Sequence, residues 1–149
     1  MTPKKTTSDG IALRHWDKIY ELSLEITNAS GRDDLIMAEI QREYLFDALD
    51  DLEAIYGKVP SLLATKGDFM PEGQDPVPFW TEAYALAVER DDPKNQLLTA
   101  SSLADYYFEK KQFDFSLKWI DAGEQLLALV PDEFEAEAFK VLRDQIEHG

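Results

Sequence analysis

Hydrophobic residues recur along nearly the whole chain at intervals of three or four positions, the spacing of one face of an α-helix. Alternation with a period of two, typical of half-buried strands, is almost absent. A first helix is expected from a cap at Ser8 or Asp9 to about Ala29, and a second, longer helix over residues 32–56. The pattern therefore predicts an all-α fold without a sheet.

The long second helix carries apolar residues on two sides. Its first stripe consists of Leu35, Ala38, Leu45, Leu49, Leu52 and Tyr56, and its second stripe of Ile36, Ile40 and Tyr44. A helix that is apolar on two sides is usually packed between neighbouring elements. We therefore expect both stripes to be covered.

Residues 66–78, KGDFMPEGQDPVP, contain three prolines and two glycines, a composition that predicts a long loop. Shorter helical patterns follow, broken at Asp92-Pro93 and at Val130-Pro131, and a capping box at Asp132 and Glu135 opens the last one. We therefore expect one domain over residues 1–149. Its parts are a long-helix hairpin at 1–65, the loop at 66–78 and packed helices at 79–149.

Residues 103–120, LADYYFEKKQFDFSLKWI, hold six aromatic rings in eighteen positions. The rings follow helical spacing on either side of a polar turn at 109–112. This arrangement predicts two antiparallel helices with most of the rings in the core between them. Small residues let helix axes approach closely, so we expect Ala104, Ser116 and Gly123 at the crossing of this pair.

The same region resembles a tetratricopeptide repeat, a family of helix pairs that recur about every 34 residues. The first helix shows the family's order of Leu, small residue and aromatic, and the second shows an aromatic followed by a small residue. Matching positions, all within residues 97–131, are Leu103, Ala104, Tyr107, Phe113, Ser116, Ile120, Gly123 and Pro131. Pro131 comes later than in the family and the turn lacks the usual Gly, while residues 1–65 match poorly.

The resemblance implies a helical-repeat fold in the C-terminal half, with a concave groove that binds peptides and is lined by the first helix of the pair. The matching exposed positions are Leu98, Ser101, Ser102, Asp105, Phe108 and Glu109. Some family members clamp a peptide's terminal carboxylate there with Lys and Asn side chains. Ser and Asp stand at those positions in this chain, so the implied partner is instead a basic or amphipathic protein segment.

Thirty Asp and Glu residues against fifteen Lys and Arg give a formal net charge of −15. Such a surface repels nucleic-acid phosphate and anionic lipid, so neither nucleic acid nor a membrane is an expected partner. The charge serves either solubility or the recognition of a basic protein, and the sequence leaves both interpretations open. An acidic immunity protein or inhibitor, or a secretion chaperone, is an alternative function in the same class.

The chain has no Cys, and it shows neither a signal-peptide pattern nor a long uninterrupted apolar run. These features favour a cytoplasmic protein. They do not predict an oligomeric state.

Asp47, Asp50 and Asp51 are spaced by one helical turn and form a second acidic patch, an alternative docking face. All-α nucleotide pyrophosphohydrolases bind magnesium through paired acidic residues three apart on two helices. Asp47 and Asp50 stand three apart on the long helix, whereas the pairs Glu21/Glu25 and Glu39/Glu43 are spaced by four. A magnesium-dependent hydrolase is therefore the alternative from another class. Convergence of Asp47 and Asp50 with a Glu from residues 21–43 would favour it.

The two histidines, His15 and His148, offer little chemistry. Neither stands three residues after a Glu, as a di-iron helical bundle requires. No Ser lies in a nucleophile elbow, and no glycine-rich phosphate loop is present. We therefore expect no catalytic residues, no metal site and no cofactor, and a protein–protein interaction module as the function.

Overall fold

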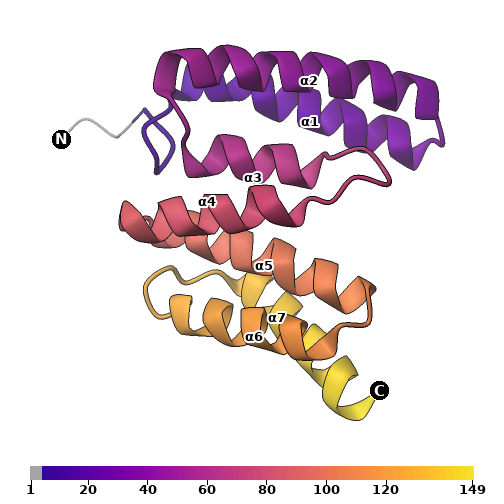
Figure 1. Ribbon diagram of the computed structural model, residues 1–149, viewed down its shortest axis with the longest axis vertical. Coiled ribbons are helices and arrows are strands. Elements are labelled where there is room, and N and C mark those ends of the chain that lie inside the picture. The colour runs from indigo at the N-terminus through magenta and orange to yellow at the C-terminus, as the bar shows by residue number, and fades with distance from the viewer. Residues whose placement is uncertain (1–4) are drawn as a thin grey trace.

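The computed structural model describes residues 5–149, which are 76% helical and form seven helices without a strand. Extended pairing in these residues is confined to one bridge between Thr6 and Ala12. The all-α prediction is confirmed. The helices, shown in Figure 1, are α1 (Leu13–Gly31), α2 (Leu35–Tyr56), α3 (Pro60–Asp68), α4 (Val77–Glu89), α5 (Pro93–Glu109), α6 (Phe113–Leu126) and α7 (Glu133–His148).

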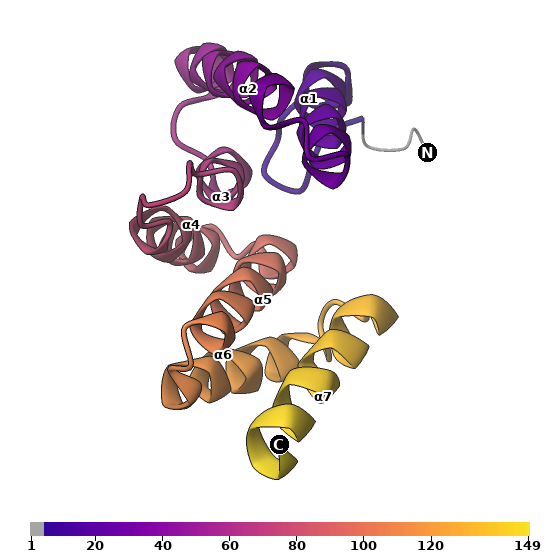
Figure 2. The same ribbon diagram turned by 90° about the vertical axis from the view of Figure 1, so that its right-hand side faces the viewer.

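The helices form stacked antiparallel pairs in two layers (Figure 2). One layer contains α1, α3, α5 and α7, and the other contains α2, α4 and α6. Each helix packs on the next one in the chain, and α5 also contacts α3 on one side and α7 on the other. Helix α5 therefore lies between α3 and α7 in its layer. Within residues 5–149 no helix is long and apolar enough to cross a lipid bilayer.

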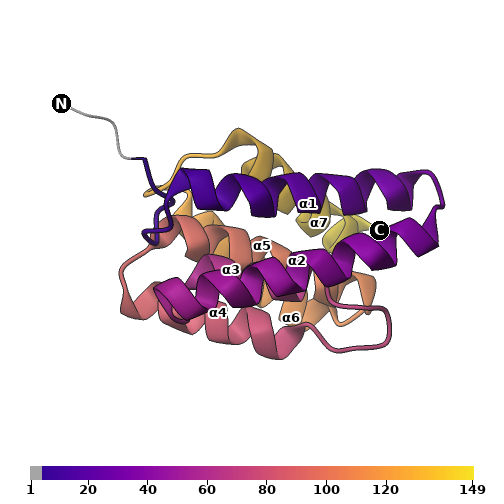
Figure 3. The ribbon, with the colours of Figure 1, turned by 90° about the horizontal axis from the view of Figure 1, so that it is seen from above.

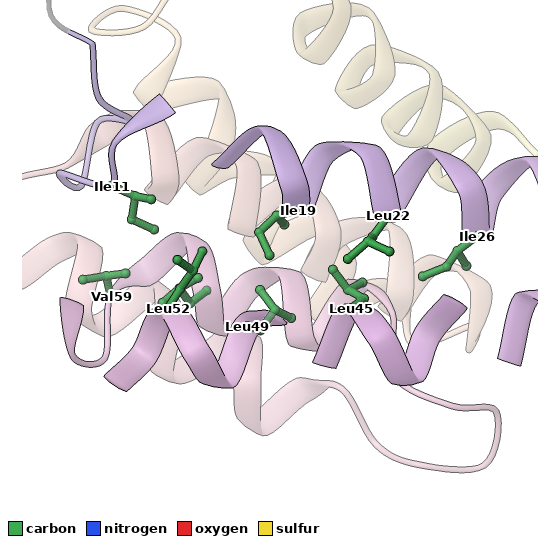
Figure 4. Close-up of a cluster of buried hydrophobic side chains, with 9 residues drawn as sticks. Ile11, Ile19, Leu22, Ile26, Leu45, Leu49, Leu52 and Val59 are labelled. Atoms are coloured by element: carbon green, nitrogen blue, oxygen red, sulfur yellow. The ribbon is translucent and has the colours of Figure 1, made fainter. Parts of the chain in front are cut away.

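A compact apolar cluster joins α1 to α2, and Figure 4 shows most of its side chains between the two helices. Its buried members are Ile11, Ile19, Leu22, Ile26, Leu45, Leu49, Leu52, Val59 and Leu62. The Asp34 side chain caps α2 by accepting a hydrogen bond from the backbone N–H of Met37 at 3.1 Å. Gly57 ends α2 with a φ of 77°, a conformation that costs glycine little.

The second apolar stripe of α2 is uncovered, contrary to the expectation from the sequence. Ile36, Ile40 and Tyr44 are 79%, 41% and 57% exposed, and Leu35 of the first stripe is exposed as well. Among the helices only α1 and α3 contact α2, and α3 has nine residues. Figure 3 shows that α1 and α2 extend beyond α3 and α4 at the end where the chain turns between them. Helix α3 is too short to reach the N-terminal half of α2.

The first helix begins later than predicted, and neither Ser8 nor Asp9 caps it. Helix α1 starts at Leu13 without a side-chain cap. Asp9 instead accepts a hydrogen bond from the backbone N–H of Ser61, at the start of α3. Ser8 donates to the carboxylate of Asp92 at 3.2 Å, at the start of α5. The segment before α1 thus ties together the N-terminal ends of two later helices.

The loop predicted at 66–78 spans only residues 69–76, because α3 continues to Asp68 and α4 begins at Val77. Gly67 lies inside α3, where the indole of Trp80 packs directly on it. A Cβ at Gly67 would come within 2.6 Å of Trp80 Nε1. The Arg42 side chain holds the loop on α2 by donating to the carbonyl oxygen of Phe69 at 2.9 Å.

Two of the three predicted small residues lie where α5 crosses α6. Ala104 and Ser116 are fully buried, and the Ser116 hydroxyl donates to the carbonyl oxygen of Ala104 at 2.8 Å. Gly123 lies instead at the crossing of α6 and α7. A Cβ there would come within 2.2 Å of the Phe139 ring of α7. The prediction for Gly123 is therefore wrong, because this residue packs against α7 and not against α5.

The expectation that most rings of residues 103–120 belong to the core is also wrong. None of the six is buried; each is half-buried or exposed. They line the seams between helices, with ring centroids 5.6 Å apart for Trp80 and Tyr106, and 4.9 Å apart for Tyr84 and Trp119. The small residues bring α5 and α6 close together, and the buried cluster of this region consists instead of Leu97, Ala104, Ile120, Leu126 and Phe139.

Candidate functional site: the exposed face of α5

The contacts of two adjacent serines show which side of α5 lies between the neighbouring helices α3 and α7. The Ser102 hydroxyl donates to Asp68 Oδ1 of α3 at 3.2 Å, while Ser101 lies beside the Glu135 carboxyl of α7. Ser102 is on the side of α5 toward α3, and Ser101 is on the side toward α7. Residues of α5 that share a helical face with both serines therefore lie over the space between α3 and α7 (Figure 2). We call Leu98, Ser101, Ser102, Asp105 and Glu109 the α5 face.

These are five of the six partner-binding residues expected from the sequence, and the structure brings them together on one side of α5. Leu98, Asp105 and Glu109 are exposed, and the two serines are half-buried. Phe108 is the exception. Its half-buried ring turns toward α6 and packs on Phe113, with ring centroids 5.7 Å apart. It contributes to the turn between α5 and α6 rather than to the α5 face.

Asp68 adds a carboxylate from α3 beside the α5 face. Its Oδ1 accepts hydrogen bonds from Trp80 Nε1 at 2.9 Å and from the Ser102 hydroxyl. Surrounding groups desolvate the carboxylate and raise its pKa, which the two hydrogen bonds partly offset. Asp68 is also the last residue of α3, at the negative end of the helix dipole, where a carboxylate is disfavoured.

Asp105 and Glu109 lie one turn apart on the same side of α5. Partial burial raises the pKa of Asp105, and the negative charge of Glu109 raises it further. Like charges at this spacing destabilise a helix by about 0.2–0.5 kcal/mol. Among the described residues no Lys or Arg pairs with either side chain.

Glu135 brings a third helix to the same place. Its backbone N–H donates to the side chain of Asp132 at 3.0 Å, as expected for a capping box. The side chain, however, lies against Ser101 of α5 and is only 8% exposed. Burial raises the pKa of its carboxyl, the nearby Ser101 hydroxyl opposes this effect, and the charge of Asp132 reinforces it.

The alternative acidic patch is divided between two sides of α2. Asp50 pairs with Lys66 of α3, at 2.9 Å from Nζ. Asp47 and Asp51 instead line a surface hollow of about 430 Å³ beside α1, together with Lys18, Glu21 and Glu25. Over residues 5–149 no group of three or more His, Asp or Glu side chains is arranged to hold a metal ion. The convergence that would favour a magnesium hydrolase is not found.

The contacts of His15 are structural. His15 Nδ1 lies 2.7 Å from the hydroxyl of Tyr56, which also accepts a hydrogen bond from the backbone N–H of Ala12. These contacts fasten the start of α1 to the end of α2. His148 is exposed in the last turn of α7.

One apolar hollow was not expected from the sequence. It measures about 330 Å³ and lies between α2 and the loop of residues 69–76, with Phe46, Met70, Pro71 and Phe79 among its lining. Its rim carries Glu39, which pairs with Arg42. The composition of the loop gave no signal for it, because the hollow depends on how Met70 and Pro71 dock on α2.

Two residues of the α5 site were likewise missed as site residues. Asp68 stands in a segment that reads as loop, and Glu135 reads as a helix cap. Only the packing of α3 and α7 on α5 places their carboxylates beside Ser101 and Ser102. Comparison with protein-family models, with curated proteins and with solved structures found no match to this chain.

Proposed function

We propose that this chain is a non-catalytic protein-binding module that receives a basic or amphipathic segment of a partner protein on the α5 face. The observation that carries the proposal is the gathering of Asp68, Asp105 and Glu135, from α3, α5 and α7, around this face. None of the three carboxylates has a Lys or Arg partner within residues 5–149.

The energetics support a cationic partner. Each of these carboxylates has a raised pKa, so the free protein holds each negative charge at a cost. A Lys or Arg side chain that arrives with a partner would stabilise the charged form and remove part of that cost. Carboxylates whose pKa is raised by desolvation and by neighbouring charge are typical of functional positions.

The spacing of the helices supports a repeat of the tetratricopeptide type. Helices α3 and α5 begin at Pro60 and Pro93, an offset of 33 residues, which is close to the 34 or so of the family. Their partners α4 and α6 begin at Val77 and Phe113, an offset of 36 residues. In this reading α3/α4 and α5/α6 are two repeats, α7 is a terminal helix, and the α5 face lines the peptide groove.

The test begins with affinity capture from the native host and identification of the captured protein by mass spectrometry. The dissociation constant of that protein is then measured for the wild type and for a double reversal, Asp105→Lys with Glu109→Lys. We expect the reversal to weaken binding about tenfold or more, which corresponds to about 1.4 kcal/mol or more.

A matched double reversal, Glu89→Lys with Asp114→Lys, has the same charge change on exposed residues of α4 and α6, in the other layer. It should leave the dissociation constant within about twofold of the wild type, since exposed charges away from an interface contribute little. Equal affinity of all three proteins would refute the proposal.

A further inference from the structure

Glu135 is buried between α5 and α7 without the partner that such a side chain normally has. It is more than nine-tenths buried, and its Oε2 atom is shielded from solvent and has no hydrogen-bond partner among the described residues. Buried polar atoms are nearly always bonded, because an unsatisfied one costs about 1–3 kcal/mol, and more when charged. The free protein therefore holds this carboxyl at a cost.

A capping role does not account for the side chain. A capping-box Glu returns to the backbone of its own helix, whereas this carboxyl faces the hydroxyl of Ser101 on α5. Asp132 supplies the cap of α7 from its own side chain. Helix α7 thus has its cap without the Glu135 carboxylate.

The surroundings of Glu135 select a cation as the missing partner. The charge that acts on it is that of Asp132, which is also acidic, and Asp105 lies one turn beyond Ser101 on the α5 face. A neutral donor or an anion would leave these charges uncompensated. One turn before Ser101 lies the exposed side chain of Leu98, apolar surface on which the aliphatic stem of Lys or Arg can lie.

We propose that Glu135 and Ser101 form the anchoring subsite of the groove, which takes one cationic side chain, Lys or Arg, of the bound segment. This subsite rests on the proposed function, since it names the partner chemistry at one point of the same groove. The cation enters between α5 and α7 and pairs with the Glu135 carboxylate, while its stem covers Leu98.

The experiment uses single-residue probes, so that it does not depend on finding the partner. N-acetyl-arginine methylamide and N-acetyl-lysine methylamide are titrated separately into ¹⁵N-labelled full-length protein, and amide chemical shifts are recorded. N-acetyl-citrulline methylamide, which has nearly the shape of the arginine probe but no charge, is the ligand control. We expect saturable shifts at the amides of Ser101 and Glu135 with at least one cationic probe and none with citrulline.

Two variants of α7 locate the binding. Glu135→Gln keeps the shape and removes the charge, and it should weaken the cationic probe about tenfold or more. Glu137→Gln makes the same change at an exposed position two residues later and should leave the titration unchanged. Saturation by only one probe would assign the subsite to Arg or to Lys. Absence of saturable shifts, or shifts that persist in Glu135→Gln, would overturn the proposal and leave Glu135 with buried water as its partner.

A stability measurement separates a ligand-binding carboxyl from a structural one. If the Glu135 carboxylate serves to bind a cation, it is uncompensated in the free protein, and Glu135→Gln should raise the urea midpoint. Loss of a structural carboxyl would lower the midpoint. Ser101→Lys places a cation beside Glu135 within the chain, and it should also raise the midpoint and block the probes. The two proposals can fail separately. If the probes bind at Glu135 but reversal of Asp105 and Glu109 leaves the partner's affinity unchanged, the proposed groove function is rejected and the subsite stands.

Discussion

Asp9 Oδ2 accepts a hydrogen bond from the backbone N–H of Ser61 at 2.7 Å, across 52 positions of sequence. Ser61 is the second residue of α3, and the residue at the N-cap of this helix is Val59, whose side chain cannot accept a hydrogen bond. Asp9 therefore supplies from the N-terminal segment the cap that α3 lacks, and its negative charge also suits the positive end of the helix dipole.

The first prediction concerns this remote cap. Asp9→Ala should lower the free energy of unfolding by about 1–2 kcal/mol, as for the loss of an N-cap. Urea denaturation followed by circular dichroism measures the change. Asp17→Ala removes the same side chain from an exposed position of α1, and it should change stability by less than about 0.5 kcal/mol. Equal effects of the two substitutions would show that the contact with Ser61 contributes nothing.

The second prediction concerns the close approach of α6 and α7. Gly123→Ala should destabilise the protein by about 1–3 kcal/mol, because the new Cβ would come within 2.2 Å of the fully buried Phe139 ring. Gly31→Ala is the control, since a Cβ at this helical glycine meets no atom within 4 Å. That change should be neutral or stabilising by up to about 1 kcal/mol. Thermal and urea unfolding of both variants measure the change. Equal stability of Gly123→Ala and the wild type would show that α6 and α7 can move apart without a cost in stability.

Much of the fold was predictable because it depends on local pattern. Helices α1 and α2 follow long apolar periodicity, and the ends of α2 follow from local signals, Asp34 at its N-cap and Gly57 at its C-cap. The break before α5 follows from Asp92-Pro93, where Asp92 caps the helix by accepting from the N–H of Asn95 at 3.2 Å. These signals act within a few residues, so the sequence displays them directly.

The rest depends on contacts between distant segments, which a single sequence does not display. Periodicity gave α2 two apolar stripes but not the number of its neighbours, so the exposure of Ile36 was unforeseen. In the candidate site the α5 residues were found from their helical register. The acids beside them, Asp68 and Glu135, depend on how α3 and α7 dock, and no local signal marks that arrangement.

The third prediction is the pH dependence of the α5 face. The pKa of Asp105 is raised in the folded protein, so as pH rises the unfolded chain loses this proton first. Ionisation of Asp105 therefore favours unfolding above its ordinary pKa of about 3.9. Asp105→Asn cannot ionise and should be more stable than the wild type at pH 7, with a gain that shrinks as pH falls toward about 4.

Urea midpoints of the wild type and of Asp105→Asn across this pH range test the prediction. Asp17→Asn is the control for loss of one negative charge from an acidic protein, and its effect should be the smaller at pH 7. A gain for Asp105→Asn that is independent of pH, or no larger than that of the control, would argue against a locally disfavoured carboxylate.

The fourth prediction decides between the two acidic surfaces. On α2, Asp50 already pairs with Lys66, and Asp51 shares a hollow with Arg14 and Lys18, so local cations offset this patch. The α5 face has no such pairing among the described residues. Once a partner is identified, its association rate should therefore depend mainly on Asp105 and Glu109.

Stopped-flow association measured from about 0.1 M to about 1 M salt provides the test, because the screening length falls from about 10 Å to about 3 Å over this range. The wild-type rate should fall about tenfold or more, as expected for electrostatic steering. The double change Asp105→Lys and Glu109→Lys should lower the rate at low salt and flatten its salt dependence, whereas Asp47→Lys with Asp51→Lys should preserve most of both. The opposite ranking would move the docking face to α1 and α2. A rate that neither pair alters would assign the charge of these surfaces to solubility, because a long-range field that guides encounter cannot be insensitive to the reversal of its sources.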